Sequence, residues 1–282
     1  MIGIITDSTC DIPESLIKQY GIVVLPQMII WDNQQYRDRI DMEPEEFYQR
    51  LISDPERPTS SQVGVPDFKQ AYEKLAEQGA SEIIVLTVSG AMSGTYQNAV
   101  QAAKLVKIPV HVVDSKGPTM SLGWQVLAAA RAREEGMDIK GILNRINQVR
   151  ERLVQYISLE SLEYLQKGGR IGGAIKWVGS KLQVKPLVSV NLQSGLVEAA
   201  GLARTHRHVV EMLYKKFFDG LKSYSNLHIA VLHGNVATEA EALAKKIQDE
   251  FHPVELIVNI TGPVLGLNTG PGALALCGYA ED

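Results

Sequence analysis

The chain has 282 residues, of which 45% are hydrophobic and 21% charged, a composition typical of a globular protein with a sizeable core. Its formal net charge of −4 argues against a nucleic-acid partner, which would require a broad basic surface. Because no apolar run approaches the roughly 18 residues that span a bilayer, we expect no integral membrane segment.

The two cysteines, Cys10 and Cys277, show neither a CxxC spacing nor a Cys/His pattern suited to zinc. We expect them to be reduced, buried thiols, which are typical of proteins in a reducing compartment. Residues 1–7 lack a basic region and a long apolar stretch, so they predict a first strand and not a signal peptide. We therefore expect a cytoplasmic protein without a bound metal or cofactor.

In the first half of the chain, short apolar runs alternate with longer amphipathic stretches, the pattern of an α/β protein with a buried parallel sheet. The runs rich in isoleucine and valine predict strands at residues 2–6, 22–30, 82–88 and 110–113. Helical periodicity predicts helices at residues 41–51, 66–78, 93–106, 121–135 and 139–153.

A second half begins near residue 154. Strands are predicted at residues 154–158, 186–190, 196–203, 227–232 and, as the last one, 254–259. Helices are predicted at residues 206–221 and 237–251. We therefore predict an α/β fold of two domains, a Rossmann-like parallel sheet in residues 1–154 and a second α/β domain in 155–282. The boundary is soft, because no low-complexity linker marks a hinge.

Four polar clusters lie where predicted strands end or helices begin, the position at which α/β folds usually bind ligands. The first, Thr6–Thr9, is expected to form a turn and a helix cap ahead of Ile12–Pro13, with a role in lining a site as the alternative. In the second, Pro58–Gln62, the hydroxyls of Thr59 and Ser60 either cap the following helix or donate hydrogen bonds to an anion.

The third cluster, Ser89–Tyr96, joins a strand to a helix. Gly90 and Gly94 allow the backbone to approach a ligand closely. Ser93 would stand near a helix N-terminus, where free N–H groups and the helix dipole favour an anion. The segment is neither a P-loop nor a GxSxG nucleophile elbow.

The fourth cluster, Gly262–Ala273, is rich in glycine and proline and is predicted to be a loop, with Asn268 and Thr269 as its polar side chains. Two basic stretches, Lys167–Gly173 and Arg204–His208, are either solvated surface or sites for an anion or a partner.

Two other functions stay open on these residues. One is a hydrolase or transferase of a small carboxylate or phosphate ester, with Ser93 as its nucleophile and His111 or His233 as its base. Each histidine is more simply a core or rim residue of a strand, and no metal-ligand set or acid–base pair supports catalysis. The third hypothesis is a regulatory protein that docks a partner through residues 204–207.

Taken together, the motifs resemble the DegV family, bacterial fatty-acid-binding proteins that serve as the B subunit of fatty acid kinase. They follow the family's order and spacing over essentially the whole chain: Thr6–Thr9, Thr59–Gln62, Ser93–Gln97, Asp114–Ser115, Ser161–Leu165, Lys167–Arg170, Lys185–Leu187 and Thr269–Ala273.

This resemblance implies a DegV-like two-domain fold with a tunnel for one long-chain fatty acid, and a lipid carrier in place of an enzyme. It implies that hydroxyls of Thr59 or Ser60 and of Ser93 hold the carboxylate. The same site would include Gly94, Thr95, Asn268 and Thr269.

The resemblance also implies a protein partner, an ATP-dependent fatty acid kinase subunit that converts the presented carboxylate into acyl phosphate. Arg170 and Arg204 match the positions implied in docking that kinase.

Two positions depart from the family pattern. Asn268 stands where histidine is usual, and Ser60–Val63 reads Ser-Ser-Gln-Val where Thr-Ser-Gln-Pro is common. Asparagine keeps a neutral N–H donor but cannot become cationic.

Burial of an alkyl chain is sufficient to drive such binding. A C16 chain has about 14 methylenes, each contributing about 0.8 kcal/mol on burial, against an association cost of about 4 kcal/mol or more. The head therefore needs only enough hydrogen bonds to offset its desolvation. We expect neutral donors and no buried arginine clamp, with Met28, Ile29, Met92 and Leu265 lining the tunnel.

Overall fold

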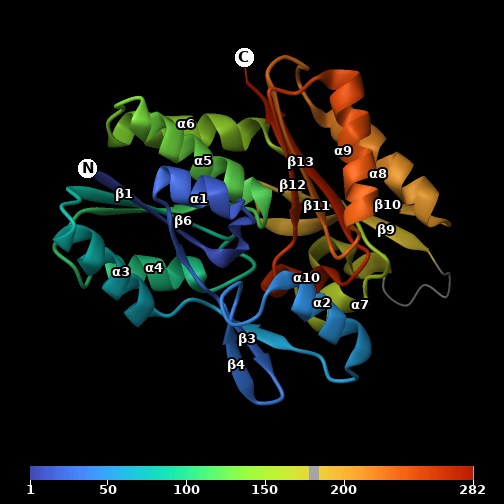
Figure 1. Ribbon diagram of the computed structural model, residues 1–282, viewed down its shortest axis with the longest axis horizontal. Coiled ribbons are helices and arrows are strands. Elements are labelled where there is room, and N and C mark those ends of the chain that lie inside the picture. The colour runs from blue at the N-terminus through green and yellow to red at the C-terminus, as the bar shows by residue number, and fades with distance from the viewer. Residues whose placement is uncertain (178–183, 282) are drawn as a thin grey trace.

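The computed structural model describes residues 1–177 and 184–281. Its first sheet is parallel, with strand order β2-β1-β6-β7 (Figure 1). The strands are β1 (Ile2–Asp7), β2 (Val23–Leu25), β6 (Glu82–Thr87) and β7 (Val110–Asp114). This is the parallel sheet that the sequence predicts for the first half.

Helices cover both faces of this first sheet. On one face, Ile5 and Val85 pack with α3 (Val65–Glu77) and α4 (Thr95–Ala103). On the other, Ile4 packs with residues of α5 (Met120–Glu134), behind which lies α6 (Ile139–Arg152), and α1 (Glu14–Tyr20) lies beside them (Figure 1). Burial on both faces explains why the strands are apolar at consecutive positions.

The second sheet is mostly antiparallel, with strand order β10-β9-β8-β13-β11-β12. Only β11 and β12 pair in parallel. Its strands are β8 (Val154–Ser158), β9 (Lys185–Asn191), β10 (Leu196–Ala203), β11 (Leu227–His233), β12 (Glu255–Ile260) and β13 (Leu274–Ala280). Helices α8 (His206–Gly220) and α9 (Ala237–Phe251) pack on one face of it.

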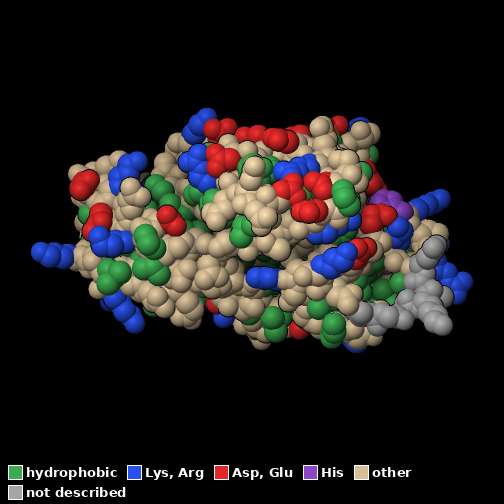
Figure 2. Space-filling view, turned by 90° about the horizontal axis from the view of Figure 1, so that it is seen from below, with side chains coloured by type: hydrophobic (Ala, Val, Ile, Leu, Met, Phe, Trp, Pro, Cys, Tyr) green, Lys and Arg blue, Asp and Glu red, His purple; other side chains and the backbone are tan. Residues whose placement is uncertain are grey.

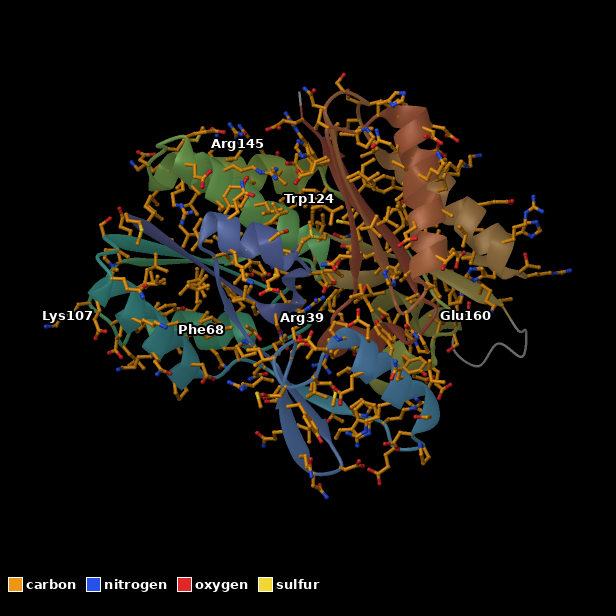
Figure 3. All side chains as sticks on the ribbon, in the orientation of Figure 1. Arg39, Phe68, Lys107, Trp124, Arg145 and Glu160 are labelled. Atoms are coloured by element: carbon orange, nitrogen blue, oxygen red, sulfur yellow. The ribbon has the colours of Figure 1, made fainter. Side chains whose placement is uncertain are left out.

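Helix α5 joins the two sheets. It contacts β1 and β6 of the first sheet and β13 of the second, and nearly all of its side chains are buried. Trp124 lies between the sheets (Figure 3), where its indole nitrogen donates to the carbonyl oxygen of Cys277 over 3.2 Å. A helix that is apolar on every side is expected where both of its faces pack against protein.

A third, small sheet has strand order β4-β3-β5 and is antiparallel. It contains β3 (Met28–Trp31), β4 (Gln34–Arg37) and β5 (Thr59–Ser61). Its buried side chains share a cluster with α2 (Pro44–Ser53) and α10 (Pro263–Thr269), and the short α7 (Glu163–Lys167) contacts α10. A segment near the N-terminus is thereby packed against one near the C-terminus, below the two larger sheets in Figure 1.

Several predicted elements differ from the observed ones. The strand expected at 22–30 is two strands in different sheets, β2 and β3, separated at Pro26, which lacks an N–H donor, and Gln27. Strand 254–259 is not the last, since β13 follows it and lies inside the second sheet. The loop expected at Gly262–Ala273 contains α10.

The partition into domains 1–154 and 155–282 stays a prediction. The first sheet uses residues up to Asp114 and the second starts at Val154, yet a single hydrophobic cluster contains residues of both sheets.

Within the described residues, no helix combines the length and hydrophobicity needed to cross a membrane. On the face seen in Figure 2, basic and acidic side chains are interspersed.

Candidate functional site

A mainly apolar cavity lies between the carboxyl ends of the first sheet and the inner face of the second. It encloses about 840 Å³ of empty space, including its open mouth. The lining residues come from segments spread over most of the chain: Thr9, Gln27, Ser60, Gln62, Val88, Met92, Ser93, Pro118, Thr119, Ile157, Leu159, Leu165, Arg170, Val188, Val190, Val197, Val264, Leu265, Asn268 and Thr269.

Part of the apolar wall is formed by the second sheet. Side chains of a strand alternate between its faces, so Val188 and Val190 of β9 point to the cavity while Leu187 packs with α8. Ile157 of β8 and Val197 of β10 extend the same wall. Of the four residues expected to line the tunnel, Met92 and Leu265 do so.

The other two of those residues do not line it, so that part of the expectation is wrong. Ile29 is fully buried in the cluster between the small sheet and α2. Met28 points to the other side of β3, into a groove beside α3. Both belong to β3 of the small sheet, whose successive side chains point to opposite faces, and neither side chain reaches the cavity.

Ser93 lies in the loop before α4, because the helix begins at Thr95 and not at Ser93 as predicted. Its hydroxyl oxygen is 2.9 Å from that of Thr95, and the Thr95 backbone N–H donates to Ser93 Oγ over 3.3 Å. Thr95 is fully buried and does not line the cavity, so it holds Ser93 in place.

Gly94 is in close contact with its neighbour Gln62. A Cβ atom at position 94 would lie 2.7 Å from Gln62 Oε1, so the Gln62 amide would have to move aside. Glycine therefore allows the Gln62 amide to lie across this loop, where it contributes to the cavity wall.

Ser60 reaches the cavity from β5, opposite Ile29 in the small sheet. Thr59, one residue earlier, lines an adjoining pocket instead. The alternative in which these hydroxyls cap the next helix is wrong, because the N-cap of α3 is Gly64. Pairing in the small sheet, which the sequence did not predict, decides which hydroxyl faces the cavity.

Asn268 and Thr269 are brought to the same cavity by α10. Asn268 Nδ2 donates to the Val264 carbonyl over 3.0 Å, and Thr269 Oγ1 donates to that of Leu265 over 3.2 Å. Asn268 Oδ1 is buried without a hydrogen-bond partner and contacts Gly168, where an added Cβ would lie 2.0 Å away. Buried polar atoms normally have partners, so this oxygen is available to a ligand or water.

Buried carboxyl groups hold this region together beneath the cavity. Asp11 accepts from the Gly262 backbone N–H and pairs with Arg39, which lies near the centre of Figure 3. Asp38 accepts from the Ser8 hydroxyl over 2.6 Å and from the Val264 N–H over 3.4 Å. Burial raises the pKa of Asp38 to about 7, although Arg39 and Ser8 act to lower it.

Thr9 and Gln27, which the sequence did not single out individually as lining residues, are positioned by Asp7. This carboxylate accepts from the Thr9 hydroxyl over 2.5 Å and from Gln27 Nε2 over 3.3 Å. It also accepts from the Thr9 backbone N–H, which confirms the predicted cap in Thr6–Thr9 at a short 3₁₀ helix, Ser8–Cys10. Burial raises the pKa of Asp7.

The two arginines expected to dock a kinase occupy different places. Arg170 lines the cavity and is exposed at its mouth, where Nε donates to the Met92 carbonyl over 3.1 Å and Nη1 to that of Gly168 over 2.6 Å. Arg204 is exposed between β10 and α8 and does not line the cavity. A second 3₁₀ helix, Gly172–Trp177, follows Arg170.

The histidines proposed as a base for Ser93 lie elsewhere. His111 Nε2 is 2.9 Å from a carboxylate oxygen of Glu82. His233 accepts from the Val236 N–H over 3.3 Å, and burial lowers its pKa. Among the described residues that line the cavity, none is a histidine or a carboxylate, so the structure provides Ser93 with no base there.

The comparisons with known proteins agree along the whole chain. The family model described as "Uncharacterised protein, DegV family COG1307" matches residues 1–281. A DegV domain-containing protein of Staphylococcus aureus (strain COL) is 33% identical over 281 residues, covering 99% of this chain and 96% of that protein.

Two solved structures share the fold. One, from Thermus thermophilus, is described as showing fatty acid binding of a DegV family protein; it is 30% identical, with a TM-score of 0.91 and 99% of each chain covered. DegV of Bacillus subtilis, described as a fatty acid binding protein, is 26% identical, with a TM-score of 0.92 and 99% of each chain covered. This chain belongs to the DegV family.

Proposed function

We propose that this protein binds one long-chain fatty acid, with the alkyl chain in the cavity and the carboxylate at its polar end. The observation that carries the proposal is the division of the cavity wall. Strands β8, β9 and β10 contribute only apolar side chains to it, whereas the hydroxyls of Ser60 and Ser93 and the amide of Asn268 come from β5, the loop before α4 and α10. The fatty acids bound by the relatives from Thermus thermophilus and Bacillus subtilis support the same ligand class.

The head-group region suits a carboxylate that must remain reactive. Ser60 and Ser93 offer uncharged donors, and each charge-assisted hydrogen bond contributes about 1.5–3 kcal/mol. The N-terminus of α4 directly follows Ser93 and favours an anion. Asn268 also lines the cavity, and its uncharged Nδ2 has a second N–H besides the one that it donates to the Val264 carbonyl. Arg170 stands at the mouth, so it does not enclose the head in a buried clamp.

We further propose that the protein is a carrier that presents the carboxylate to a separate ATP-dependent fatty acid kinase subunit. That subunit would transfer a phosphoryl group from ATP to a carboxylate oxygen, giving acyl phosphate and ADP. Arg170 at the cavity mouth and the exposed Arg204 are the proposed docking residues. The free, buried thiols of Cys10 and Cys277 support a location in the reducing cytoplasm.

Lipid analysis of the purified protein tests this function. Denaturation and extraction should release a long-chain fatty acid, which mass spectrometry identifies. Delipidated protein should bind one molecule of palmitate or oleate per chain. Absence of both would refute fatty acid binding. Acyl phosphate made by a fatty acid kinase subunit only when this protein is present would support the carrier role, and turnover of an ester by this chain alone would contradict it.

A further inference from the structure

Three buried polar side chains of the cavity wall have no part in the proposed head-group site. Thr9, Gln27 and Thr119 line the cavity, and each is at most 5% exposed. They come from segments at the carboxyl ends of the first sheet: Thr9 follows β1, Gln27 lies between β2 and β3, and Thr119 lies between β7 and α5. These three residues are called the polar floor below. Because β8, β9 and β10 contribute only apolar side chains, an alkyl chain in the cavity has a polar surface on one side only.

The members of the polar floor lie around one buried carboxyl group and one short helix. Asp7 accepts hydrogen bonds from the Thr9 hydroxyl over 2.5 Å and from Gln27 Nε2 over 3.3 Å. Helix α5 packs against the 3₁₀ helix Ser8–Cys10, and Thr119 is the N-cap residue of α5. The three side chains therefore belong to the same part of the wall.

The polar floor has hydrogen-bonding capacity that the described residues leave unused. Gln27 donates one Nε2 hydrogen to Asp7, while its second Nε2 hydrogen and its Oε1 bond to no described residue. Thr119 Oγ1 accepts from the Met120 backbone N–H, and its hydroxyl hydrogen is donated to no described residue. Buried polar groups normally have partners, because facing an alkyl chain without one costs free energy. These groups therefore indicate an oxygen-containing partner inside the cavity.

The chemistry of the polar floor selects a neutral group that both donates and accepts. Gln27 Oε1 requires a donor, whereas the Thr119 hydroxyl and the free Gln27 N–H require an acceptor. A hydroxyl group satisfies both requirements, and a ketone satisfies only the second. An anion is disfavoured there, since the buried Asp7 carboxyl lies behind the polar floor and Arg170, at the mouth, is the only cationic residue among the described lining.

We propose that Thr9, Gln27 and Thr119 form a subsite for a hydroxyl group on the acyl chain, so that the protein accepts long-chain hydroxy fatty acids. The inference rests on the proposed fatty acid function and specifies its substrate class. The ligand hydroxyl donates to Gln27 Oε1 and accepts from Thr119 Oγ1 or Gln27 Nε2. Ordered water makes the same bonds when the chain carries no hydroxyl, and the test distinguishes the two occupants.

The first test varies the ligand on delipidated wild-type protein. Isothermal titration calorimetry compares stearate with 3-, 10- and 12-hydroxystearate, because a hydroxyl buried without partners weakens binding about tenfold. At least one isomer is expected to bind as tightly as stearate, and its position shows how far along the chain the subsite lies. The ketone at that same position should bind more weakly, since Gln27 Oε1 then lacks a donor. A loss of tenfold or more for every isomer would overturn the subsite and leave water as the occupant.

The second test varies the protein. Gln27→Met and Thr119→Val preserve approximate side-chain volume but remove the polar groups. Each is expected to weaken the best hydroxy isomer about tenfold and to strengthen stearate slightly, because apolar surface then faces the chain. Thr119→Ser retains the hydroxyl and should retain the preference. Val190→Ala, on the opposite wall, should weaken both ligands alike, and Thr238→Val, exposed at the start of α9, should change neither.

The ratio of the two affinities separates recognition of the hydroxyl from structural support of the wall. An unchanged ratio in both Gln27→Met and Thr119→Val would overturn the subsite and leave the fatty acid function intact. Failure of wild-type protein to bind stearate would refute the proposed function and the subsite with it. Both substitutions also remove bonds within the protein, to Asp7 and to the Met120 N–H, so unfolding midpoints are compared by circular dichroism. Where a variant does not fold, the comparison of isomers on wild-type protein decides.

Discussion

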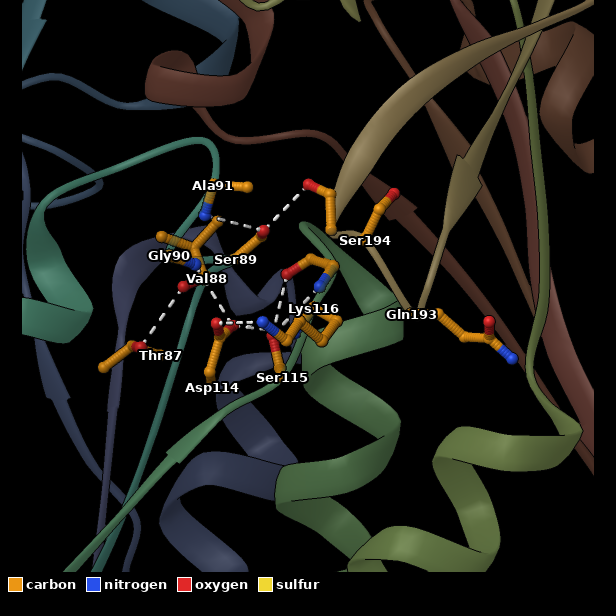
Figure 4. A network of polar contacts seen from close by, with 12 residues as sticks. Thr87, Val88, Ser89, Gly90, Ala91, Asp114, Ser115, Lys116, Gln193 and Ser194 are labelled. Atoms are coloured by element: carbon orange, nitrogen blue, oxygen red, sulfur yellow. Dashed lines mark hydrogen bonds and ion pairs between the residues drawn. The ribbon is translucent and has the colours of Figure 1, made fainter.

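The Ser89 hydroxyl donates to the carbonyl oxygen of Gly195 over 2.8 Å, and this bond connects the loop after β6 with the turn between β9 and β10 (Figure 4). The same loop continues to Ser93, and the same turn joins the strands that form the apolar wall of the cavity. The bond therefore sets the polar and apolar sides of the site relative to each other.

Replacement of Gly195 by alanine is predicted to destabilise the protein through this contact. Gly195 has φ +76°, and an added Cβ would lie 2.2 Å from Ser89 Oγ. Left-handed backbone alone costs a non-glycine residue about 1–2 kcal/mol, and loss of the buried hydrogen bond adds about 1–3 kcal/mol. Urea unfolding should show Gly195→Ala to be less stable than Gly79→Ala, since Gly79 has φ +90° but no atom near the added Cβ. Equal losses would show that the Ser89 contact contributes little.

Ser93→Ala is predicted to weaken palmitate binding about tenfold, because one charge-assisted hydrogen bond to the head group, about 1.5 kcal/mol, is lost. Titration of delipidated protein measures the effect. Ser225→Ala removes a hydroxyl from an exposed loop and should leave the affinity unchanged. An unchanged dissociation constant for Ser93→Ala would remove this serine from the proposed site.

Gly168→Ala is predicted to lower palmitate affinity without a large loss of stability. The backbone at Gly168, with φ −71°, suits alanine, but the new Cβ would displace the side chain of Asn268 from the cavity wall. The neighbouring Gly169→Ala is the reciprocal control: Gly169 has φ +72° and no atom near its Cβ position, so stability should fall while affinity stays constant. If Asn268 carries the effect, Gly168→Ala should cost no further affinity in an Asn268→Ala background.

Asp38 is predicted to make the protein less stable as pH rises. Its pKa is about 7 in the folded protein, raised by burial from an ordinary value of 3.8. The folded state therefore retains the proton more strongly than the unfolded chain, so this contribution to stability is complete below pH 3.8 and is lost as pH rises through 7.

Between pH 5 and 8 the expected loss from Asp38 is about 3 kcal/mol, since about two pH units below its pKa are crossed and each corresponds to about 1.4 kcal/mol. Asp38→Asn keeps an amide of similar shape and removes the titration. The unfolding free energy of the wild type should fall relative to that of the variant over this range. A constant difference between the two proteins would show that Asp38 does not change its protonation there.

Local sequence patterns determined much of the first sheet and most helices. Continuous apolar runs at residues 2–6 and 82–88 predicted strands buried on both faces, because covering helices exclude water from both sides of a parallel sheet. Helical periodicity located α3, α5 and α9 to within one residue at each end. The family motifs also identified Ser60, Ser93 and Asn268, which the fold places around one cavity.

Tertiary structure decided which partners those segments would meet. Pro26 divides a single apolar run between two sheets, and β13 enters the centre of the second sheet from the end of the chain. Strand register then places Ser60 on the wall of the cavity, while Thr59 lines only the adjoining pocket. Hydrophobic periodicity indicates which side of a helix or strand is buried. Which strands pair, and in which register, depends on interactions between residues that are far apart in the sequence, so a short segment cannot predict it.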